Sequence, residues 1–242
     1  MGAGRVGSSL AAAAERAGLR VTLAGRAEAL EACREAEAVL LCVPDETIEQ
    51  VAEEIAGSGA RPRFAGHTSG ASSLATLGTL GDAGARSFSL HPLQTVPDRS
   101  TDFTACPCAI SGSDPEALAL ALALAERLGM RAFEIDEERR AAYHAAACIA
   151  SNFLVALEES AAALLREAGA ADARQLLAPL VLRTAANWSE RGAEALTGPI
   201  SRGDEATVAR HLAALHEAAP ELVPLYEALA DRTRELARQE QR

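Results

Sequence analysis

Three glycines near the start of the chain have the spacing of a pyrophosphate-binding turn. Gly2, Gly4 and Gly7 fit the pattern G-x-G-x-x-G, and a helical run follows over residues 8–18. In such a turn the first glycine allows a tight bend, the second removes a Cβ beneath the phosphates, and the third lets the helix pack on a strand. The N–H groups at the start of the helix then face the phosphates. We therefore expect a dinucleotide to bind at Gly2, Gly4, Arg5, Val6 and Gly7.

A second contact with the dinucleotide is expected about 20 residues further along the chain. NAD-specific sites usually place Asp or Glu there to bind the ribose hydroxyls, whereas this sequence has Arg26 after the apolar segment 19–24. A guanidinium can pair with the 2′-phosphate of NADP and stack on the adenine. NADP is therefore favoured over NAD. Glu28 lies close enough to leave NAD open, and Arg26 could instead be a solvated loop residue.

Polar residues follow several of the predicted strands. The apolar run 38–43 ends at Val43 and Pro44, which we expect to line the cofactor crevice. The segments 67–70 (HTSG) and 91–94 (HPLQ) follow the next two strands. Ligands bind beyond the carboxyl ends of strands in open α/β sheets. We therefore expect a small oxygen-rich acid to bind near Ser69, Gly70, His91 and Gln94, although a lone loop histidine is often structural.

A long helix, predicted over residues 137–168, carries polar side chains on an Ala/Leu-rich surface. His144, Cys148 and Asn152 are spaced i, i+4, i+8 and would share one face. Polar groups are costly to bury without partners, so these residues either satisfy one another in the core or face a pocket, which we favour. Thr197 lies in a break between later helices and could reach an anionic substrate, although a plain turn explains this segment equally well.

The order of the predicted elements indicates the fold class. Strands and helices alternate up to residue 136, with strands expected at 19–24, 38–43, 63–66, 86–90, 106–111 and 131–135. Only helices follow, at about 137–168, 172–191, 204–217 and 220–239. This pattern predicts an α/β protein: a Rossmann-like, doubly wound, mostly parallel sheet over residues 1–136 and an all-α substrate or dimerisation domain over residues 137–242.

The first strand of such a sheet is not present in the sequence. A dinucleotide turn should follow about five apolar residues, and only Met1 precedes Gly2. We hypothesise that the natural start lies upstream of Met1. If Met1 is the genuine start, unpaired strand edges, weak cofactor binding and aggregation are expected.

Composition excludes several classes of protein. The 242 residues carry a formal net charge of −11 and only 3 % aromatic residues, without a basic stripe, which argues against nucleic-acid binding. No continuous apolar run reaches the ~18 residues of a membrane span, and no signal peptide is visible. We expect a soluble cytoplasmic protein that binds neither membrane nor nucleic acid. The five cysteines show no paired framework, so we expect reduced thiols and no metal site, with the C-x-C at 106–108 as the exception to consider.

Taken together, these motifs resemble a known superfamily. The front-end turn, the AVLLCVPD segment and the change to an all-α half are similar to 6-phosphogluconate dehydrogenase, ketopantoate reductase and pyrroline-5-carboxylate reductase. Within that superfamily, HTSGA, LHPLQT, YHAAACIASNFLVAL and LTGPISRGD resemble the Rossmann-like proteins with a DUF2520 C-terminal domain. The resemblance covers essentially the whole chain.

The resemblance implies hydride transfer from NADPH to a small 2-oxo acid, such as ketopantoate, or to a cyclic imine acid. Several relatives carry Lys-x-x-x-Asn on the long helix, with the lysine as proton donor. Here Asn152 matches the asparagine, but Cys148 stands at the lysine position, and a thiol cannot supply the positive charge of an ammonium group. His144, one turn earlier, is the nearest alternative acid. We therefore expect His144, Asn152 and His91 to act in catalysis.

Two other functions remain open from the sequence. A dinucleotide-binding or sensor protein could keep the fold after losing the lysine, and a scaffold-type dimer could bind no nucleotide at all. The apolar helices of the second half usually require a partner, which predicts a homodimer through the helical domain.

Overall fold

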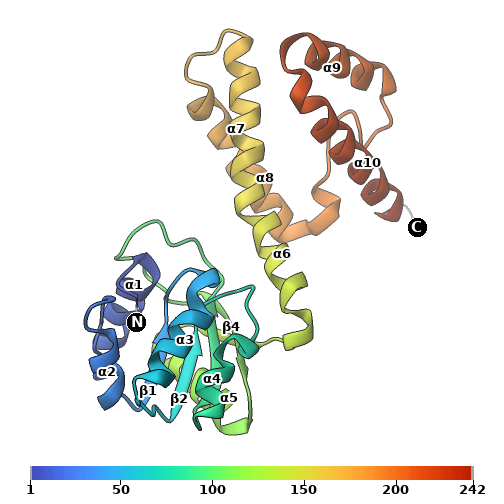
Figure 1. Cartoon of the computed structure of the whole chain (residues 1–242). Helices are drawn as coiled ribbons and strands as arrows, with labels where there is room; N and C mark the ends of the chain where they lie inside the picture. The colour runs from blue at the N-terminus through green and yellow to red at the C-terminus, as the bar shows by residue number, and fades with distance from the viewer. Residues whose placement is uncertain (1, 241–242) are drawn as a thin grey trace. The chain divides into compact units, whose positions relative to one another are not determined.

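The computed structural model describes residues 2–240, which form two compact units (Figure 1). One unit extends up to Ser151, and the other begins at Asn152. The first unit mixes strands and helices, whereas the second is entirely helical. The α/β fold class is therefore confirmed. The short helix η3 (Glu137–Arg139) and helix α6 (Arg140–Ala150) follow the last strand and still belong to the first unit.

The first unit is built on a five-stranded sheet in the order β1-β2-β3-β4-β5. All neighbouring strands are parallel except β3 and β4, which confirms a mostly parallel sheet. Leu41 pairs with His67, and His67 pairs with Ser89, so the carboxyl ends of β1, β2 and β3 lie at one edge. The strands are β1 (Ala38–Leu41), β2 (Phe64–His67), β3 (Arg86–Pro92), β4 (Pro107–Gly112) and β5 (Arg131–Glu134).

Apolar side chains cover both faces of this sheet, as the continuous hydrophobic strands predict. Side chains alternate along a strand, so Leu40 packs with one cluster whereas Val39 and Leu41 pack with the other. Helices α1 (Arg5–Arg16) and α5 (Pro115–Arg127) contribute to the first cluster. The second cluster includes residues of α2 (Ala29–Glu35), α3 (Ile48–Gly57), the short helix η2 (Leu74–Leu77) and α4 (Gly78–Asp82). The sheet is thus doubly wound.

The predicted strand at residues 19–24 is wrong. In the described residues this segment has no ladder partner, and it makes only isolated backbone hydrogen bonds, such as Gly2 N to Ala24 O at 3.1 Å. A β-strand is stabilised by a row of hydrogen bonds to a neighbouring strand. Without that row the apolar segment remains irregular, although it still connects α1 to the Arg26 loop.

The long helix predicted over residues 137–168 is interrupted. It consists of η3, α6 and α7 (Asn152–Glu167), and Ser151 departs from helical geometry with φ −121° and ψ −71°. Ser and Asn side chains compete for backbone hydrogen bonds, which favours helix ends over helix interiors. As a result His144 and Cys148 share α6, whereas Asn152 begins α7, and the three do not lie on one uninterrupted helix.

Ion pairs between side chains at the surface connect helices of the second unit. Arg174 of α8 (Ala173–Arg191) bonds Glu159 of α7 at 2.7 Å, and Arg234 of α10 (Val223–Glu240) bonds Glu205 of α9 (Glu205–Ala218) at 2.9 Å. Asp204 caps α9 by accepting a hydrogen bond from Thr207 N at 3.0 Å. The short helices η4 (Gly192–Ala195) and η5 (Pro220–Leu222) connect these elements.

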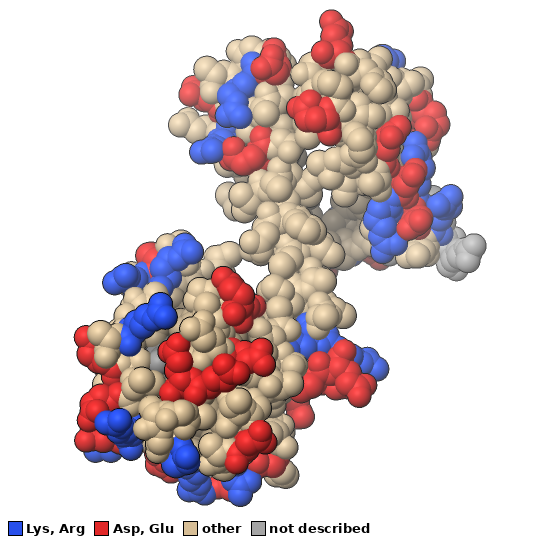
Figure 2. Space-filling model, viewed as in Figure 1, with Lys and Arg blue, Asp and Glu red and all other residues tan. Residues whose placement is uncertain are grey.

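One stretch of the described chain, Glu137–Glu167, has the length and composition of a membrane span, with a mean hydropathy of 1.4. Polar residues such as His144 and Asn152 interrupt this stretch, so it is not a continuous apolar run. Only 6 % of the apolar window in this stretch is buried in the structure, so most of its surface is exposed. Figure 2 shows few charged side chains on the surface of α6 and the adjoining part of α7.

Candidate functional site

The glycine turn has the close packing that its motif requires. Gly2 has φ +98°, and a Cβ there would lie 2.2 Å from the carbonyl oxygen of Cys42. A Cβ on Gly7 would lie 1.9 Å from the carbonyl oxygen of Gly2, whereas one on Gly4 would meet no atom within 4 Å. The first and third glycines therefore allow the turn, β1 and α1 to approach closely, and the second leaves open space above the turn.

Helix α1 begins directly behind this turn. Arg5, Val6 and Gly7 form its first turn, and Gly4 at the N-cap supplies no side chain to accept their N–H groups. The first turn of the helix contains no acidic residue, which would repel a bound anion and compete with it for the N–H groups. Unpaired N–H groups and the positive end of the helix dipole make this a position suited to a phosphate.

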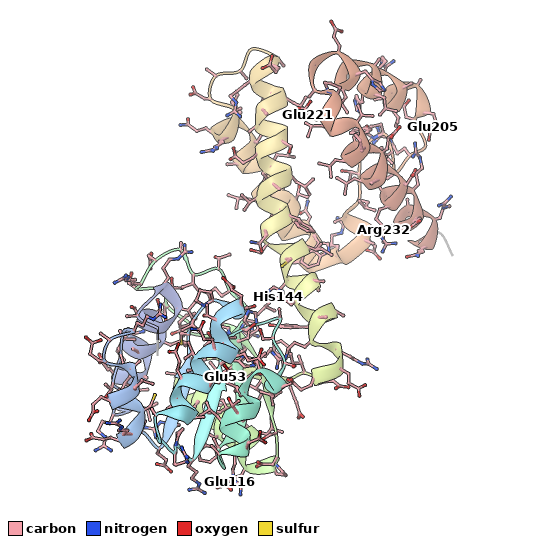
Figure 3. The ribbon with its side chains drawn as sticks, viewed as in Figure 1. Glu53, Glu116, His144, Glu205, Glu221 and Arg232 are labelled. Carbon is pink, nitrogen blue, oxygen red and sulfur yellow. The ribbon has the colours of Figure 1, made fainter. Side chains whose placement is uncertain are left out.

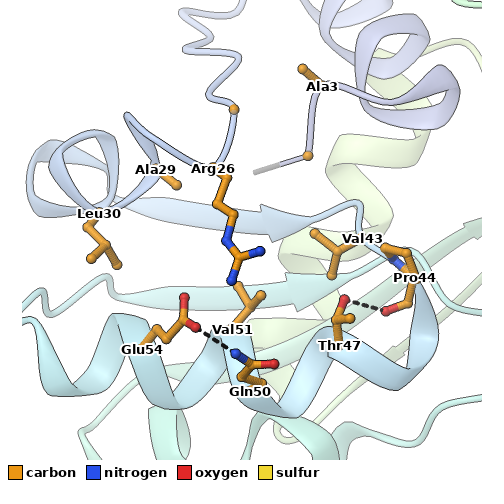
Figure 4. A pocket seen from close by; sticks show the side chains of 12 residues that line it. Ala3, Arg26, Ala29, Leu30, Val43, Pro44, Thr47, Gln50, Val51 and Glu54 are labelled. Atoms are coloured by element: carbon orange, nitrogen blue, oxygen red, sulfur yellow. Dashed lines mark hydrogen bonds between the residues drawn. The ribbon is translucent and has the colours of Figure 1, made fainter.

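A cavity of about 380 Å³ lies beside the turn (Figure 4). Of the residues predicted to contact a cofactor, it is lined by Gly2, Arg26, Val43 and Pro44. The Arg26 side chain extends into the space between the turn and α3, as the close view shows. The lining residues that sequence reasoning missed are Ala3, Gly25, Ala29, Leu30, Thr47, Gln50, Val51 and Glu54.

Half of these missed residues belong to the elements that follow β1. Thr47 ends the short helix η1 (Asp45–Thr47), and Gln50 and Glu54 lie on α3, joined by a 2.9 Å hydrogen bond. Their i, i+4 spacing places them on one helix face, which was a usable signal in the sequence. The cavity therefore contains both a guanidinium and a carboxylate, at a site of the size that small-molecule pockets have.

A buried arginine connects α6 to the sheet. The side chain of Arg140 is 1 % exposed, and its Nη2 donates to Ser89 Oγ at 2.6 Å and to Ser111 Oγ at 2.7 Å. The same guanidinium pairs with Glu137 Oε1 at 2.5 Å and donates from Nη1 to the carbonyl oxygen of Ser69 at 3.3 Å. Arg140 thus ties the start of α6 to β3, β4 and the turn after β2.

Glu137 completes this network. Burial of its carboxyl opposes ionisation, but hydrogen bonds from Arg140, Ser111 and the Leu74 N–H outweigh it, so the pKa of Glu137 is lowered. The Ser111 hydroxyl donates to Glu137 Oε1 at 2.6 Å, and Leu74 N donates to Oε2 at 2.7 Å. A buried guanidinium needs such partners to offset its desolvation. Sequence reasoning missed Glu137 and Arg140, although two charges three residues apart at the start of an apolar helix were a visible signal.

Next to the Glu137–Arg140 network, α6 brings two aromatic side chains, Tyr143 and His144, against His91. Tyr143 Oη lies 2.6 Å from His91 Nδ1, and the rings of His91 and His144 meet edge to face with centroids 6.2 Å apart. A Cβ at Gly70 would lie 2.7 Å from His144 Cδ2 and 2.8 Å from His91 Nε2. The structure therefore brings together three predicted residues, Gly70, His91 and His144, at the carboxyl edge of the parallel strands. His144 is labelled on α6 in Figure 3.

Burial keeps His91, Tyr143 and the neighbouring His67 uncharged near neutral pH. Desolvation, with contributions from His144 and Arg140, lowers the pKa of His91 to about 4. Desolvation, with a contribution from Cys108, raises the pKa of Tyr143 to about 12. His67, at the end of β2, is fully buried, and desolvation with the nearby Arg140 charge lowers its pKa to about 4. His67 is thus a core residue, whereas His91 and His144 are partly exposed.

The other predicted residues have different surroundings. Ser69 is buried, and its Oγ accepts hydrogen bonds from Ala71 N at 3.1 Å and Ser72 N at 2.9 Å. Gln94 is exposed, and its amide donates to the Asp102 carbonyl at 3.0 Å. Cys148 Sγ lies 4.0 Å from His144 Nδ1. Asn152 and Thr197 are exposed residues of the helical unit. Among residues 2–240, no group of three or more His, Cys, Asp or Glu is arranged to hold a metal ion.

Comparison with known proteins identifies the family. Residues 106–233 match the model of a domain of unknown function, DUF2520, and residues 23–92 match a Rossmann-like domain. The DUF2520 match covers more than half of the chain, so the protein belongs to this family, as its motifs predicted. No curated protein sequence matches the chain.

Solved structures share the whole fold. A Bacteroides fragilis protein, assigned as an NADP oxidoreductase, is 25 % identical, with a TM-score of 0.79 over 97 % of this chain and 96 % of its own. A Thermotoga maritima protein is 27 % identical, with a TM-score of 0.71 over 83 % and 79 % of the two chains. The Aspergillus terreus reductive aminase in complex with NADPH is 17 % identical, with a TM-score of 0.68 over 96 % and 91 %, and shares the fold.

Proposed function

We propose that this protein is an NADPH-dependent reductase. The observation that carries the proposal is a combination within one unit. The Gly2–Gly7 turn opens an uncapped helix, a cavity lined by Arg26 lies beside it, and His91 and His144 meet at the carboxyl edge of the same sheet. Ligands of open α/β sheets bind at this edge. The assignment of the 25 % identical relative as an NADP oxidoreductase supports the same conclusion.

The residues around the turn fit the bound cofactor. Gly4 and the first N–H groups of α1 would hold the pyrophosphate, since Gly4 leaves open space there. Arg26 would pair with the 2′-phosphate in the cavity. When bound, NADPH supplies a hydride. The carboxylate of Glu54, on α3 across the cavity, would oppose a second negative charge, so the distinction between NADP and NAD rests on Arg26.

The substrate proposed is a small 2-oxo acid or a cyclic imine acid. It would lie near Ser69, Gly70, His91 and Gln94, which belong to the same unit. Reduction adds the hydride to carbon and a proton to the carbonyl oxygen or imine nitrogen, and His144 is the residue proposed to give that proton. Ser69 Oγ already accepts two N–H groups, which leaves its own hydrogen to donate to a carboxylate.

The experiment is an assay of NADPH oxidation with a panel of 2-oxo acids and cyclic imine acids, run beside calorimetric titration with NADPH. We expect binding and substrate-stimulated oxidation. His144→Ala should lower kcat by at least ~10²-fold if His144 is the acid, whereas His216→Ala, an exposed histidine of α9, should not change it. NADPH binding without oxidation would indicate a sensor protein. Absence of both binding and oxidation would indicate a scaffold protein that binds no nucleotide.

The proposed enzyme acts as a homodimer through its helical domain. Large apolar side chains are exposed on α6, α7 and α8, including Val155 at 63 %, Leu182 at 71 % and Trp188 at 66 %. Soluble monomers rarely expose such patches. Arg174, Arg183 and Arg191 on α8 are poorly compatible with lipid contact, so a second copy of the chain is the better partner.

Sedimentation velocity at micromolar concentration should therefore show a dimer. The double variant Leu182→Asp, Trp188→Ser should shift it to a monomer, and Leu93→Asp, an exposed leucine of the other unit, should remain dimeric. A monomeric wild-type protein, or co-sedimentation with lipid vesicles, would contradict this assembly.

A further inference from the structure

We propose that Tyr143 is a positioning residue that fixes the tautomer of His91, so that the Nε2–H of His91 points at the Ser69–Gly70 turn as a hydrogen-bond donor to the substrate. The inference rests on the proposed reductase function and adds a residue to it. Its starting point is the 2.6 Å contact between Tyr143 Oη and His91 Nδ1.

The two possible directions of this hydrogen bond are not equivalent. If the phenol donates, the bare Nδ1 of a neutral imidazole accepts, and the ring proton is on Nε2. If Nδ1–H donates instead, the phenol proton has no acceptor among the hydrogen bonds of the described residues. The bare nitrogen of a neutral imidazole is also a stronger base than the oxygen of a neutral phenol. Both considerations favour the phenol as donor.

The protonation states allow this arrangement near neutral pH. Burial keeps the pKa of His91 at about 4 and that of Tyr143 at about 12, so the pair holds one ring proton and one phenol proton. The titratable groups that act on His91 are His144, Arg140 and His67, which oppose its protonation, and Asp45, which favours it.

The ring nitrogen opposite Tyr143 faces the candidate site. The Nε2 edge of His91 lies where a Cβ on Gly70 would be only 2.8 Å away, and the His144 ring borders the same point. Nε2 makes no hydrogen bond with the residues that the structure describes. An N–H in this position can donate to the carbonyl oxygen of a 2-oxo acid or to the carboxylate of either kind of substrate. It lies next to His144, the proposed proton donor.

The neighbours of Tyr143 hold its hydroxyl in place. Arg140, three residues earlier on α6, is bonded to β3 and β4, and β3 carries His91. Phe133 packs edge to face on the Tyr143 ring, with centroids 6.0 Å apart. The ring of Tyr143 therefore keeps its packing when only the hydroxyl is removed, which makes Tyr143→Phe a clean variant.

The first test reads the tautomer directly, by long-range ¹H–¹⁵N NMR of the histidine rings in the full chain at pH 7. The His91 signals are identified by their loss in His91→Gln. We expect a protonated Nε2 and a bare Nδ1 in the wild type, and averaged signals from both tautomers in Tyr143→Phe. A wild-type Nδ1–H, or signals unchanged by Tyr143→Phe, overturns the inference.

The second test reads the consequence in catalysis. Tyr143→Phe should lower kcat about 10- to 100-fold with little change in the KM for NADPH. Tyr226→Phe is the matched control, because Tyr226 Oη forms a similar 2.8 Å contact with His211 Nδ1 in the helical unit; it should change neither value. An unchanged kcat in Tyr143→Phe overturns the role. If the wild type shows no turnover, the proposed function fails, and the NMR result still decides the tautomer.

Discussion

At the scale of single residues, Arg26 is the side chain on which the choice of cofactor depends. It lines the cavity beside the glycine turn, opposite Glu54 on α3. A guanidinium forms charge-assisted hydrogen bonds with a phosphate, and NADH lacks the 2′-phosphate that Arg26 would bind. Arg26 therefore affects the two cofactors differently.

Arg26→Ala should weaken NADPH binding about 10-fold, which corresponds to ~1.4 kcal/mol, and leave NADH binding nearly unchanged. Calorimetric titration with each cofactor measures both effects. Arg34→Ala provides a control, because Arg34 is an exposed arginine of nearby α2 whose partner is Glu31 at 2.9 Å. Equal losses for the two cofactors would contradict a 2′-phosphate contact.

Within the glycine motif, Gly7 is required for packing of the protein, whereas Gly4 is expected to contact only the ligand. Gly7→Ala places a Cβ 1.9 Å from Gly2 O, and overpacking of this kind costs about 1–3 kcal/mol. Gly4→Ala meets no protein atom within 4 Å, so urea unfolding should show little loss of stability. NADPH affinity should nevertheless fall, because the new methyl group occupies the space for the phosphates. A stable Gly7→Ala protein would show that the turn relaxes easily.

At the scale of elements, the Glu137–Arg140 pair determines where α6 begins. The pair joins this helix to β3, β4 and the turn after β2, and Arg140 is almost fully buried. Tyr143 and His144 follow at i+3 and i+4, on the same face of the helix. The network therefore fixes Tyr143 and His144, the residues proposed to act at the substrate site, relative to the sheet.

Arg140→Met should destabilise the protein by about 3–5 kcal/mol, because it leaves the buried partners of the guanidinium uncompensated. Arg174→Met removes an arginine from an exposed pair with Glu159, and exposed pairs contribute little, so its effect should be much smaller. Urea unfolding of the two variants under one condition measures the difference. Similar small losses for both would show that the buried network is not a stabilising anchor.

At the scale of the whole molecule, the buried histidines make stability depend on pH. The pKa values of His67 and His91 are lowered from 6.5 to about 4. The unfolded chain therefore binds protons that the folded chain does not between pH 6.5 and 4. The stabilisation is fully present above pH 6.5 and is lost as the pH falls through this window, with a slope of up to ~1.4 kcal/mol per pH unit for each histidine. Glu137, whose pKa is also lowered, contributes only in more acidic solution.

Urea unfolding at several pH values between 7 and 4.5 should show this loss. His67→Asn should reduce the slope by about one proton's contribution, whatever its effect on stability at pH 7. His216→Gln, at an exposed position of α9, should leave the slope unchanged. A slope that does not differ between the wild type and His67→Asn would contradict the burial of a neutral His67.

Local patterns in the sequence were sufficient to predict the class of the fold and the close packing of the glycine turn. The alternation of apolar runs with helical periods predicted five of the strands, because strands buried on both faces must be continuously apolar. The glycine spacing predicted a turn whose close contacts, at Gly2 and Gly7, leave no room for a Cβ. The combination of motifs also predicted the DUF2520 family.

Other features depended on contacts between distant segments. The segment 19–24 has the composition of a strand, but a strand exists only with a ladder partner, and composition does not show whether one is present. The break at Ser151 and the hydrogen bond from Tyr143 to His91 likewise depend on tertiary packing. The sequence by itself determined which residues are apolar, which turns need glycine and which family the chain belongs to. Only the tertiary structure brought Arg140 into contact with β3 and β4, and Tyr143 into contact with His91. Residues about 30 to 50 positions apart become neighbours only after the sheet has formed.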